Sequence, residues 1–231
     1  MRIATLLRYV DLKKGNTWDH RYYIMDDYRR LATQYKIGMA AIMTEYDLEG
    51  ICRECDGLLV PGSASNIDPS YYGMPPFDPP EVVDEYALDS QVIRYFLDHK
   101  KPVFGICGGH QALNVYFGGT LKLLNDPVRH MDAGENAHVI DITEGSFVHN
   151  VFRTSSATVN SHHNWEIGRL ASELEVAAKS RDGVIEAVEC RERNVFATQW
   201  HPEQSFHTGD PIEHAFFENF LKRCEECRFG I

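Results

Sequence analysis

The sequence has no apolar run that approaches the roughly 20 residues needed to span a membrane. It has no surplus of positive charge: the formal net charge is −11, which argues against a general nucleic-acid surface, because phosphates attract basic groups. It also has no internal repeat, no low-complexity linker and no G-x-x-x-x-G-K-[ST] phosphate-binding loop. The N-terminus turns polar too early for a signal peptide, so we expect a cytoplasmic protein without membrane or nucleic-acid partners.

What the chain does contain is ordinary globular composition: 231 residues, 43% of them hydrophobic and 25% charged. This length suits one large α/β domain or two small ones, and it is long enough to bury a substantial core without covalent crosslinks. We predict a single domain over residues 1–231. A homodimer is the default expectation for its assembly.

Six cysteines are present, and in a cytoplasmic protein we expect them to be reduced. Four of them form two C-x-x-C pairs, at residues 52–55 and 224–227. Two such pairs could build a four-thiolate zinc site, but in those sites the pairs are usually close in sequence, whereas these lie at opposite ends of the chain. His162 and His163 could also suggest a metal, yet neighbouring side chains on a strand point to opposite faces. We therefore predict no metal ligands and no cofactor.

Short apolar runs bounded by turn residues alternate with helical patterns in the first half of the chain. We predict strands over 2–9, 38–43, 56–62 and 101–107, and helices over 18–35 and 84–100. Successive strand–helix–strand units imply parallel strands with right-handed crossovers. In the second half, strand-like segments follow one another at 138–143, 157–161, 174–180, 184–190 and 194–200, before a last helix over 211–227. The pattern favours a three-layer, doubly wound, mostly parallel α/β fold of flavodoxin type with an antiparallel extension.

After the third predicted strand comes "PGSASNIDPSYYGMPPFDPPEVV", which holds six prolines in 23 residues. A segment this long and this rich in turn residues is typical of a loop over a functional site. Tyr71 and Tyr72 could line a pocket there, and exposed aromatic side chains without a role fit them equally well.

The stretch "GICGGHQ" at 105–111 raises the question whether Cys107 is a nucleophile or a small buried residue. A buried strand runs into G-x-C-x-G and then into a helix, which is the cysteine version of a nucleophile elbow. Glycines permit a strained backbone at the turn, and a helix N-terminus favours a thiolate and directs N–H groups at developing negative charge. The N–H of Gly108 is the natural oxyanion donor. Taken alone, the motif fits a buried cysteine at least as well.

A thiol nucleophile needs a base, and the base needs an orienting carboxylate. "WHPEQ" places His201 after a predicted strand and Glu203 two residues further on, with Pro202 stiffening the turn between them. Alone, this would be a surface histidine and glutamate, but together with Cys107 it forms a coherent Cys-His-Glu triad. His110 is nearer in sequence, yet it lies on the following helix and is expected to pack or cap locally.

"GICGGHQ" followed by "WHPE" near the C-terminus resembles the class I glutamine amidotransferase superfamily. More narrowly, "DGLLVPGSASNIDPSYYG", "NVYFGGTL", "VNSHH" and "DGVIEAVE" are similar to segments of its γ-glutamyl hydrolase branch, peptidase family C26, and especially to γ-glutamyl-γ-aminobutyrate hydrolase-like proteins. The resemblance covers nearly the whole chain. It implies the glutamine amidotransferase-like form of the three-layer fold and a small γ-glutamyl substrate.

The resemblance also implies a role for each matching residue. Cys107 would attack a γ-glutamyl amide to form a thioester, His201 would move the proton, and Glu203 would hold His201. The N–H groups of Gly62 and Gly108 would bind the oxyanion. Water would then release glutamate.

Three further matches, expected to bind the glutamyl part of the substrate, are Gln111, Ser161 and His162. The chain departs from the branch's usual pattern at Gly108, where that branch has an arginine, so we expect open space there. In "NSHHNW", Asn164 and Trp165 stand where the branch has a histidine and a glutamine. These changes affect the pocket, so the identity of the leaving amine stays open.

Three functions fit the pattern. The first is a stand-alone cysteine hydrolase of γ-glutamyl amides. The second is a glutaminase subunit that delivers ammonia to a separate synthetase; the chain has no synthetase domain, and the "PSYYG" loop points to the hydrolase branch. The third is a catalytically silent binding domain, against which the intact Cys107, His201 and Glu203 argue.

Overall fold

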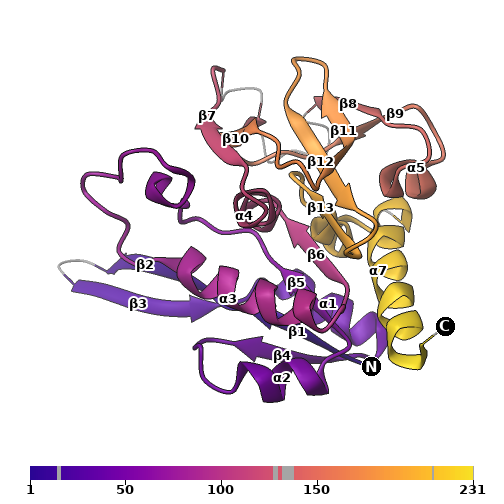
Figure 1. The fold of residues 1–231 in the computed structure, drawn as a ribbon, viewed down its shortest axis with the longest axis horizontal. Helices are drawn as coiled ribbons and strands as arrows, with labels where there is room; N and C mark the ends of the chain where they lie inside the picture. The colour runs from indigo at the N-terminus through magenta and orange to yellow at the C-terminus, as the bar shows by residue number, and fades with distance from the viewer. Residues whose placement is uncertain (15–16, 127–129, 132–137, 210, 231) are drawn as a thin grey trace.

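The computed structural model describes residues 1–14, 17–126, 130–131, 138–209 and 211–230. In this part of the chain, one nine-stranded sheet forms the middle layer, in the order β4-β1-β5-β6-β13-β12-β11-β8-β9 (Figure 1). Helices pack on both faces of the sheet, so the predicted three-layer α/β fold is confirmed. None of the described helices is long and apolar enough to cross a membrane.

The parallel half of the sheet consists of five short strands: β4 (Gly38–Ile42), β1 (Arg2–Leu6), β5 (Gly57–Val60), β6 (Val103–Ile106) and β13 (Val195–Thr198). The last three are buried along their whole length, as expected of strands that have helices on both faces. Their carboxyl ends meet at one edge of the sheet, where open α/β sheets bind their ligands.

The antiparallel half continues outward from β13 through four strands: β12 (Ile185–Cys190), β11 (Glu175–Ser180), β8 (His138–Ile142) and β9 (Ser156–Val159). This confirms the predicted antiparallel extension. Two strands that were not predicted, β7 (Thr120–Leu123) and β10 (Trp165–Arg169), pair with each other in a separate small sheet.

Two apolar clusters attach the helices to the sheet. One contains α2 (Leu48–Glu54), α3 (Glu85–Asp98) and α4 (Gly108–Tyr116). The other, on the opposite face, contains α1 (Asp26–Tyr35), α5 (Phe147–Phe152), α6 (Ser205–Thr208) and α7 (Pro211–Phe229). The predicted helices over 84–100 and 211–227 are thus confirmed as α3 and α7, whereas α2 and α5 were not predicted. Two short 3-10 helices are η1 (Pro69–Tyr72) and η3 (Pro202–Gln204).

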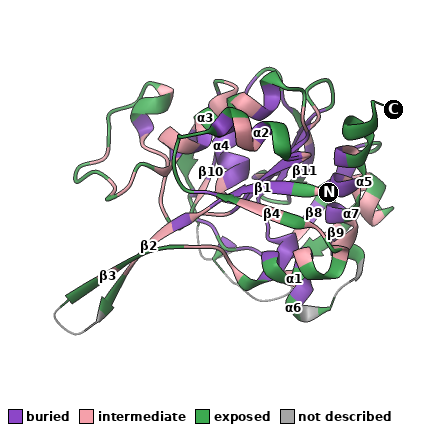
Figure 2. Cartoon of the chain, turned by 90° about the horizontal axis from the view of Figure 1, so that it is seen from below, coloured by how far each residue is buried: buried purple, intermediate pink, exposed green. Residues whose placement is uncertain are grey.

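The helix predicted over 18–35 is wrong in its first part. The chain instead forms a hairpin of β2 (Arg8–Lys14) and β3 (Thr17–Tyr23), whose outer part projects from the domain and is exposed (Figure 2), and α1 begins at Asp26. The two strands pair residue by residue, and the rings of Tyr9 and Tyr22 meet edge-on at 5.5 Å. Cross-strand aromatic pairs of this kind favour the hairpin over the helical spacing seen along the chain.

Candidate active site

Cys107 lies at the junction of β6 and α4, at the carboxyl edge of the sheet. Its backbone has φ 51° and ψ −104°, a conformation that L-amino acids rarely adopt, so the turn is strained. Two hydrogen bonds maintain it: the Cys107 N–H donates to the Thr198 carbonyl at 2.8 Å, and the Gln111 N–H donates to the Cys107 carbonyl at 3.1 Å. The thiol is therefore fixed at the N-terminus of α4.

Two glycines on either side of Cys107 allow α4 to approach the sheet closely. A Cβ on Gly109 would lie 2.1 Å from the carbonyl oxygen of Val60, and a Cβ on Gly105 would lie 2.7 Å from the carbonyl oxygen of Gly109. Neither position can carry a side chain unless the backbone shifts. The G-x-C-x-G spacing is thus a packing requirement of this strand-to-helix turn.

His201 follows β13 and immediately precedes η3. Its Nδ1 lies 2.7 Å from Oε1 of Glu203, a carboxylate that is completely buried. A hydrogen bond from Nδ1–H to the carboxylate fixes the ring orientation and leaves Nε2 as the atom that can exchange a proton.

The thiol of Cys107 and the imidazole of His201 meet beside Gly62, in the loop after β5. A Cβ on Gly62 would lie 3.2 Å from Cε1 of His201, 3.4 Å from Cβ of Cys107 and 3.9 Å from its Sγ. Burial lowers the pKa of His201, but the charges of Glu203 and Cys107 and hydrogen bonding to them outweigh burial and raise this pKa well above its usual value. The surroundings of His201 therefore favour its protonated imidazolium form.

Asn160, just after β9, fixes the backbone of His201 and was not predicted as a site residue. Its Nδ2 donates to the His201 carbonyl at 2.9 Å, and its Oδ1 accepts from the His201 N–H at 2.8 Å. The available signal was its place beside Ser161 in the "VNSHH" segment.

Arg8 supports the loop that carries Gly62, and it too was not predicted. Its guanidinium, 3% exposed, donates to the carbonyls of Pro61 at 2.8 Å and Gly62 at 3.2 Å, and to the carboxylate of Asp89 at 2.8 Å. The loop after β5 is thereby tied to α3. An arginine at the end of an apolar strand was the signal in the sequence.

At Gly108 the structure contradicts the expected open space. A Cβ there would lie 2.9 Å from the backbone nitrogen of Ser63 and 3.2 Å from its Cβ. Ser63 is itself fixed, because its Oγ donates to the carboxylate of Glu85 and accepts from the N–H of Ser65. The backbone at Ser63 occupies the space through which an arginine side chain would have to leave the helix.

Gln111 and His110, in the first turn of α4, both contact Gln199. Nε2 of Gln111 donates to Oε1 of Gln199 at 3.2 Å and to the carbonyl of Trp165 at 3.0 Å. Nδ1 of His110 lies 3.2 Å from the same Oε1 of Gln199, and burial lowers the pKa of His110 to about 4. His110 is therefore a neutral, buried residue at pH 7, in agreement with the local packing role expected for it.

Ser161 and His162 differ in their burial and in their contacts. Ser161 is buried, and its Oγ donates to the carbonyl of His130 at 2.9 Å. His162 is exposed, and its carbonyl accepts from the Cys107 thiol at 3.8 Å. The adjacent His163 is buried, so the two neighbouring imidazoles face opposite sides, as expected.

The proline-rich loop packs its tyrosines locally. The ring of Tyr71 meets that of Tyr86 edge-on at 4.7 Å, and Tyr72 packs against the apolar core. Further along the loop, Phe77 lies 5.7 Å from Trp165, ring centre to ring centre. The loop thus reaches the start of β10. Core packing accounts for Tyr72, whereas Tyr71 is 43% exposed.

The two C-x-x-C pairs do not form a shared site. Cys52 and Cys55 belong to α2 and its end, and Cys224 and Cys227 lie in α7. All are free thiols, and burial raises the pKa of Cys55 to about 11. Among the described residues, one group of three or more histidine, cysteine or acidic side chains could share a metal ion, and it contains no cysteine: His130, His163 and Glu186.

Known proteins share both sequence and fold with this chain. The model of the family described as peptidase C26 matches residues 4–203. The gamma-glutamyl-gamma-aminobutyrate hydrolase PuuD of Escherichia coli (strain K12) is 30% identical over 192 residues, which cover 77% of this chain and 75% of PuuD. The glutamine amidotransferase-like protein YvdE of Lactococcus lactis is 32% identical over 179 residues, which cover 71% and 72% of the two chains. A Thermoplasma acidophilum protein described as part of a GMP synthase has a similar fold, with a TM-score of 0.67 at 22% identity over 99% of this chain and 96% of that chain.

Proposed function

The chain belongs to the peptidase C26 family, and we propose that it is a hydrolase that cleaves the γ-glutamyl amide bond of small γ-glutamyl compounds through a thioester on Cys107. The observation that carries the proposal is the meeting of Cys107 and His201 beside Gly62, with Glu203 bonded to the far side of the imidazole. A thiol, a base and an orienting carboxylate are the groups that nucleophilic amide cleavage requires. Relatives named gamma-glutamyl-gamma-aminobutyrate hydrolase support the γ-glutamyl acyl group.

In the first half-reaction, Sγ of Cys107 attacks the δ-carbonyl carbon of the glutamyl group while His201 holds the thiol proton on Nε2. The raised pKa of His201 supports this step, because an imidazole with a higher pKa holds the transferred proton more firmly. The oxyanion of the tetrahedral intermediate accepts hydrogen bonds from the N–H groups of Gly62 and Gly108. When the intermediate collapses, the C–N bond breaks, the imidazolium protonates the leaving amine, and the thioester forms.

In the second half-reaction, water attacks the thioester carbonyl and His201 takes a proton from it. The C–S bond then breaks, glutamate leaves, and the thiolate of Cys107 and the imidazolium of His201 are restored. Glu203 keeps the imidazole in one orientation through both steps. We assign the glutamyl part of the substrate to the backbone of Ser161 and His162 together with Gln111.

The test is the release of glutamate from a panel of γ-glutamyl amides and from glutamine. We expect turnover of the amides, little turnover of glutamine, and no turnover by Cys107→Ser. Cys190→Ser is the matched control, since both cysteines are 7% exposed. Strong glutaminase activity that needs a partner protein would instead indicate delivery of ammonia to that partner, and the absence of both turnover and an acid-stable thioester would refute the proposal.

A further inference from the structure

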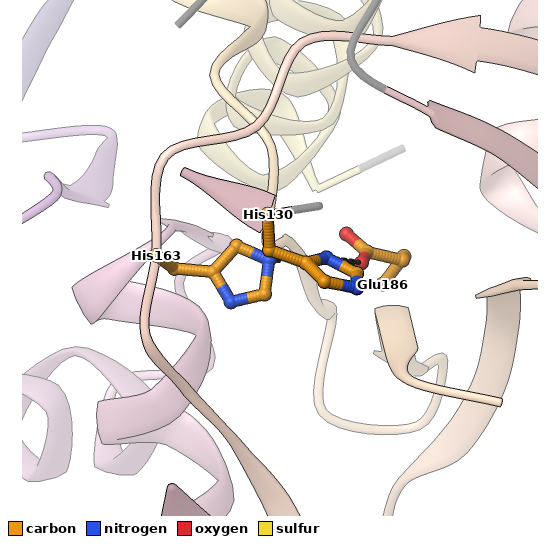
Figure 3. Close-up of side chains that lie close together, drawn as sticks. All are labelled: His130, His163 and Glu186. Carbon is orange, nitrogen blue, oxygen red and sulfur yellow. Dashed lines mark ion pairs between the residues drawn. The ribbon is translucent and has the colours of Figure 1, made fainter. Parts of the chain in front are cut away.

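Outside the residues of the proposed reaction, three histidines surround one buried carboxylate. Glu186, in β12, is completely buried, and His130 and His163 point toward it from two loops (Figure 3), while His138 reaches it from the start of β8. Oε1 of Glu186 lies 3.4 Å from Nδ1 of His130, 3.1 Å from Nε2 of His138 and 3.7 Å from Nε2 of His163. Nothing in the proposed reaction uses this cluster, so it needs its own explanation.

Two of the three histidines are oriented by a hydrogen bond at their outer nitrogen. Nε2 of His130 lies 3.1 Å from Oδ2 of Asp182, and Nδ1 of His163 lies 2.9 Å from the carbonyl of Trp165. In the neutral imidazoles each acceptor takes the ring proton on that outer side, so that the inner nitrogens present lone pairs toward Glu186. Histidines that bind metals almost always donate their other N–H to a carboxylate or carbonyl in this way.

The inner atoms of the cluster have no hydrogen-bond partner among the described residues. They are both carboxylate oxygens of Glu186, Nδ1 of His130, Nε2 of His163 and both ring nitrogens of His138. Buried polar atoms are nearly always hydrogen-bonded, and a buried carboxylate is strongly unfavourable unless a cation, either a protonated histidine or a metal ion, is paired with it. Lone pairs from several residues that converge on one point are stabilised by a cation that they share.

The spacing and chemistry of these atoms fit a tetrahedral zinc site. Ligands at about 2.0–2.1 Å from a tetrahedral ion lie about 3.3 Å from one another. The distances from Glu186 to His130 and His163, 3.4 and 3.7 Å, are close to that value, and the ligand atoms of these three residues all lie within 4.8 Å of one another. Imidazole ligands select Zn²⁺ or a neighbouring transition metal over Mg²⁺ and Ca²⁺, which prefer oxygen. We propose that His130, His163 and Glu186 bind one Zn²⁺-class divalent ion, a site absent from the sequence-based prediction, with His138 beside Glu186 at its edge.

The position of the cluster gives the ion a structural role. The carbonyl of His130 accepts hydrogen bonds from the Oγ of Ser161 at 2.9 Å and from the N–H of His163 at 2.8 Å. Between them lies His162, whose carbonyl contacts the Cys107 thiol. The ion thus fixes the segment that faces the thiol.

Elemental analysis of the wild-type protein, stripped with a chelator and reconstituted with Zn²⁺ or Co²⁺, tests the site directly. We expect one equivalent of metal per chain, and for Co²⁺ the visible absorption of a tetrahedral ion without a thiolate charge-transfer band. Cys107→Ser should bind the same equivalent, which separates this site from metal capture by the thiol. Binding well below one equivalent, or binding lost in Cys107→Ser, would overturn the proposal.

A variant that leaves the three ligands in place tests the arrangement more finely. Asp182→Asn removes the carboxylate behind His130 and should weaken Zn²⁺ binding about 10- to 100-fold, whereas the exposed Asp141→Asn should leave it unchanged. Glu186→Gln should abolish stoichiometric binding and the rise in Tm that Zn²⁺ produces in the wild type. Unchanged affinity in Asp182→Asn or full binding in Glu186→Gln contradicts the ligand set.

Discussion

Asn160 and His201 are joined by two hydrogen bonds between one side-chain amide and one backbone unit: Nδ2 donates to the His201 carbonyl at 2.9 Å, and Oδ1 accepts from the His201 N–H at 2.8 Å. β13 ends at Thr198, so Asn160 replaces the neighbouring strand that His201 no longer has. Glu203 meanwhile fixes the imidazole ring. The candidate base is therefore oriented independently at its backbone and at its side chain.

We expect Asn160→Ala to lower kcat/KM for γ-glutamyl amides by about 100-fold, because a displacement of the base by about 1 Å has an effect of that order. The matched control is Asn150→Ala, at an exposed position in α5. Circular dichroism would verify that both variants fold. Wild-type kcat/KM in a folded Asn160→Ala protein would contradict the positioning role.

Replacing Arg8 should mainly lower the free energy of unfolding of the protein. Arg8→Met leaves the buried carboxylate of Asp89 without its partner, and breaking a buried ion pair from one side lowers the free energy of unfolding by about 3–5 kcal/mol. Arg2→Met, which breaks the exposed pair of Arg2 with Glu54, should change it by about 0–1 kcal/mol. Urea denaturation measures both variants, and equal losses would show that Arg8 does not act as a buried tie.

Gly108 offers a test of close packing. Gly108→Ala forces the Ser63 backbone to move, so we expect it to lower the free energy of unfolding by about 1–3 kcal/mol and to reduce turnover as well. Gly38→Ala is the control, because the nearest atom to its added Cβ lies at 3.8 Å. If Gly108→Ala is as stable and as active as the wild type, the contact with Ser63 is not a constraint.

The Glu203 carboxylate should set the alkaline limb of the pH–rate profile. The folded protein raises the pKa of His201, so its imidazolium persists to higher pH, and protonation of the leaving amine fails only as pH rises through that pKa. Glu203→Gln removes a charge that raises this pKa, so the alkaline limb of kcat/KM should move to lower pH. Glu189→Gln, which changes another buried carboxylate, is the control. A profile that does not move in Glu203→Gln would exclude this coupling.

The raised pKa of His201 also makes the stability of the fold depend on pH in a definite direction. Because the pKa of His201 is higher in the folded than in the unfolded protein, proton binding there stabilises the fold fully below the unfolded pKa of about 6.5. This contribution is lost as pH rises through the folded pKa. The loss of stability on the alkaline side should therefore be smaller in Glu203→Gln, as measured by urea denaturation across pH.

The fold was largely predictable, because the buried strands and the long helices carry local signals. β5, β6 and β13 are continuous apolar runs, and α3 and α7 place their apolar residues at helical spacing. The β2–β3 hairpin was not, since its stability comes from pairing across the turn rather than from periodicity along the chain. The seven-residue α2 is too short to show a clear period.

Some residues of the candidate site were predictable from the sequence, and others were not. Cys107, His201 and Glu203 stand in short motifs whose neighbours reveal the chemistry, and the structure brings all three together. Arg8 and Asn160 act through partners far away in sequence, so no local motif marks them. The histidines around Glu186 are likewise gathered from separate loops and strands.

At Cys107, the side chain that the proposed activity needs lies on a backbone conformation that lowers the stability of the fold. With φ 51° and ψ −104°, every side chain except glycine's is unfavourable there, by about 1–3 kcal/mol. Laboratory evolution for heat resistance alone would therefore reward glycine at position 107 and yield a sturdier but inert protein. A thermostabilised variant of this chain is useful only if selection for turnover is applied at the same time.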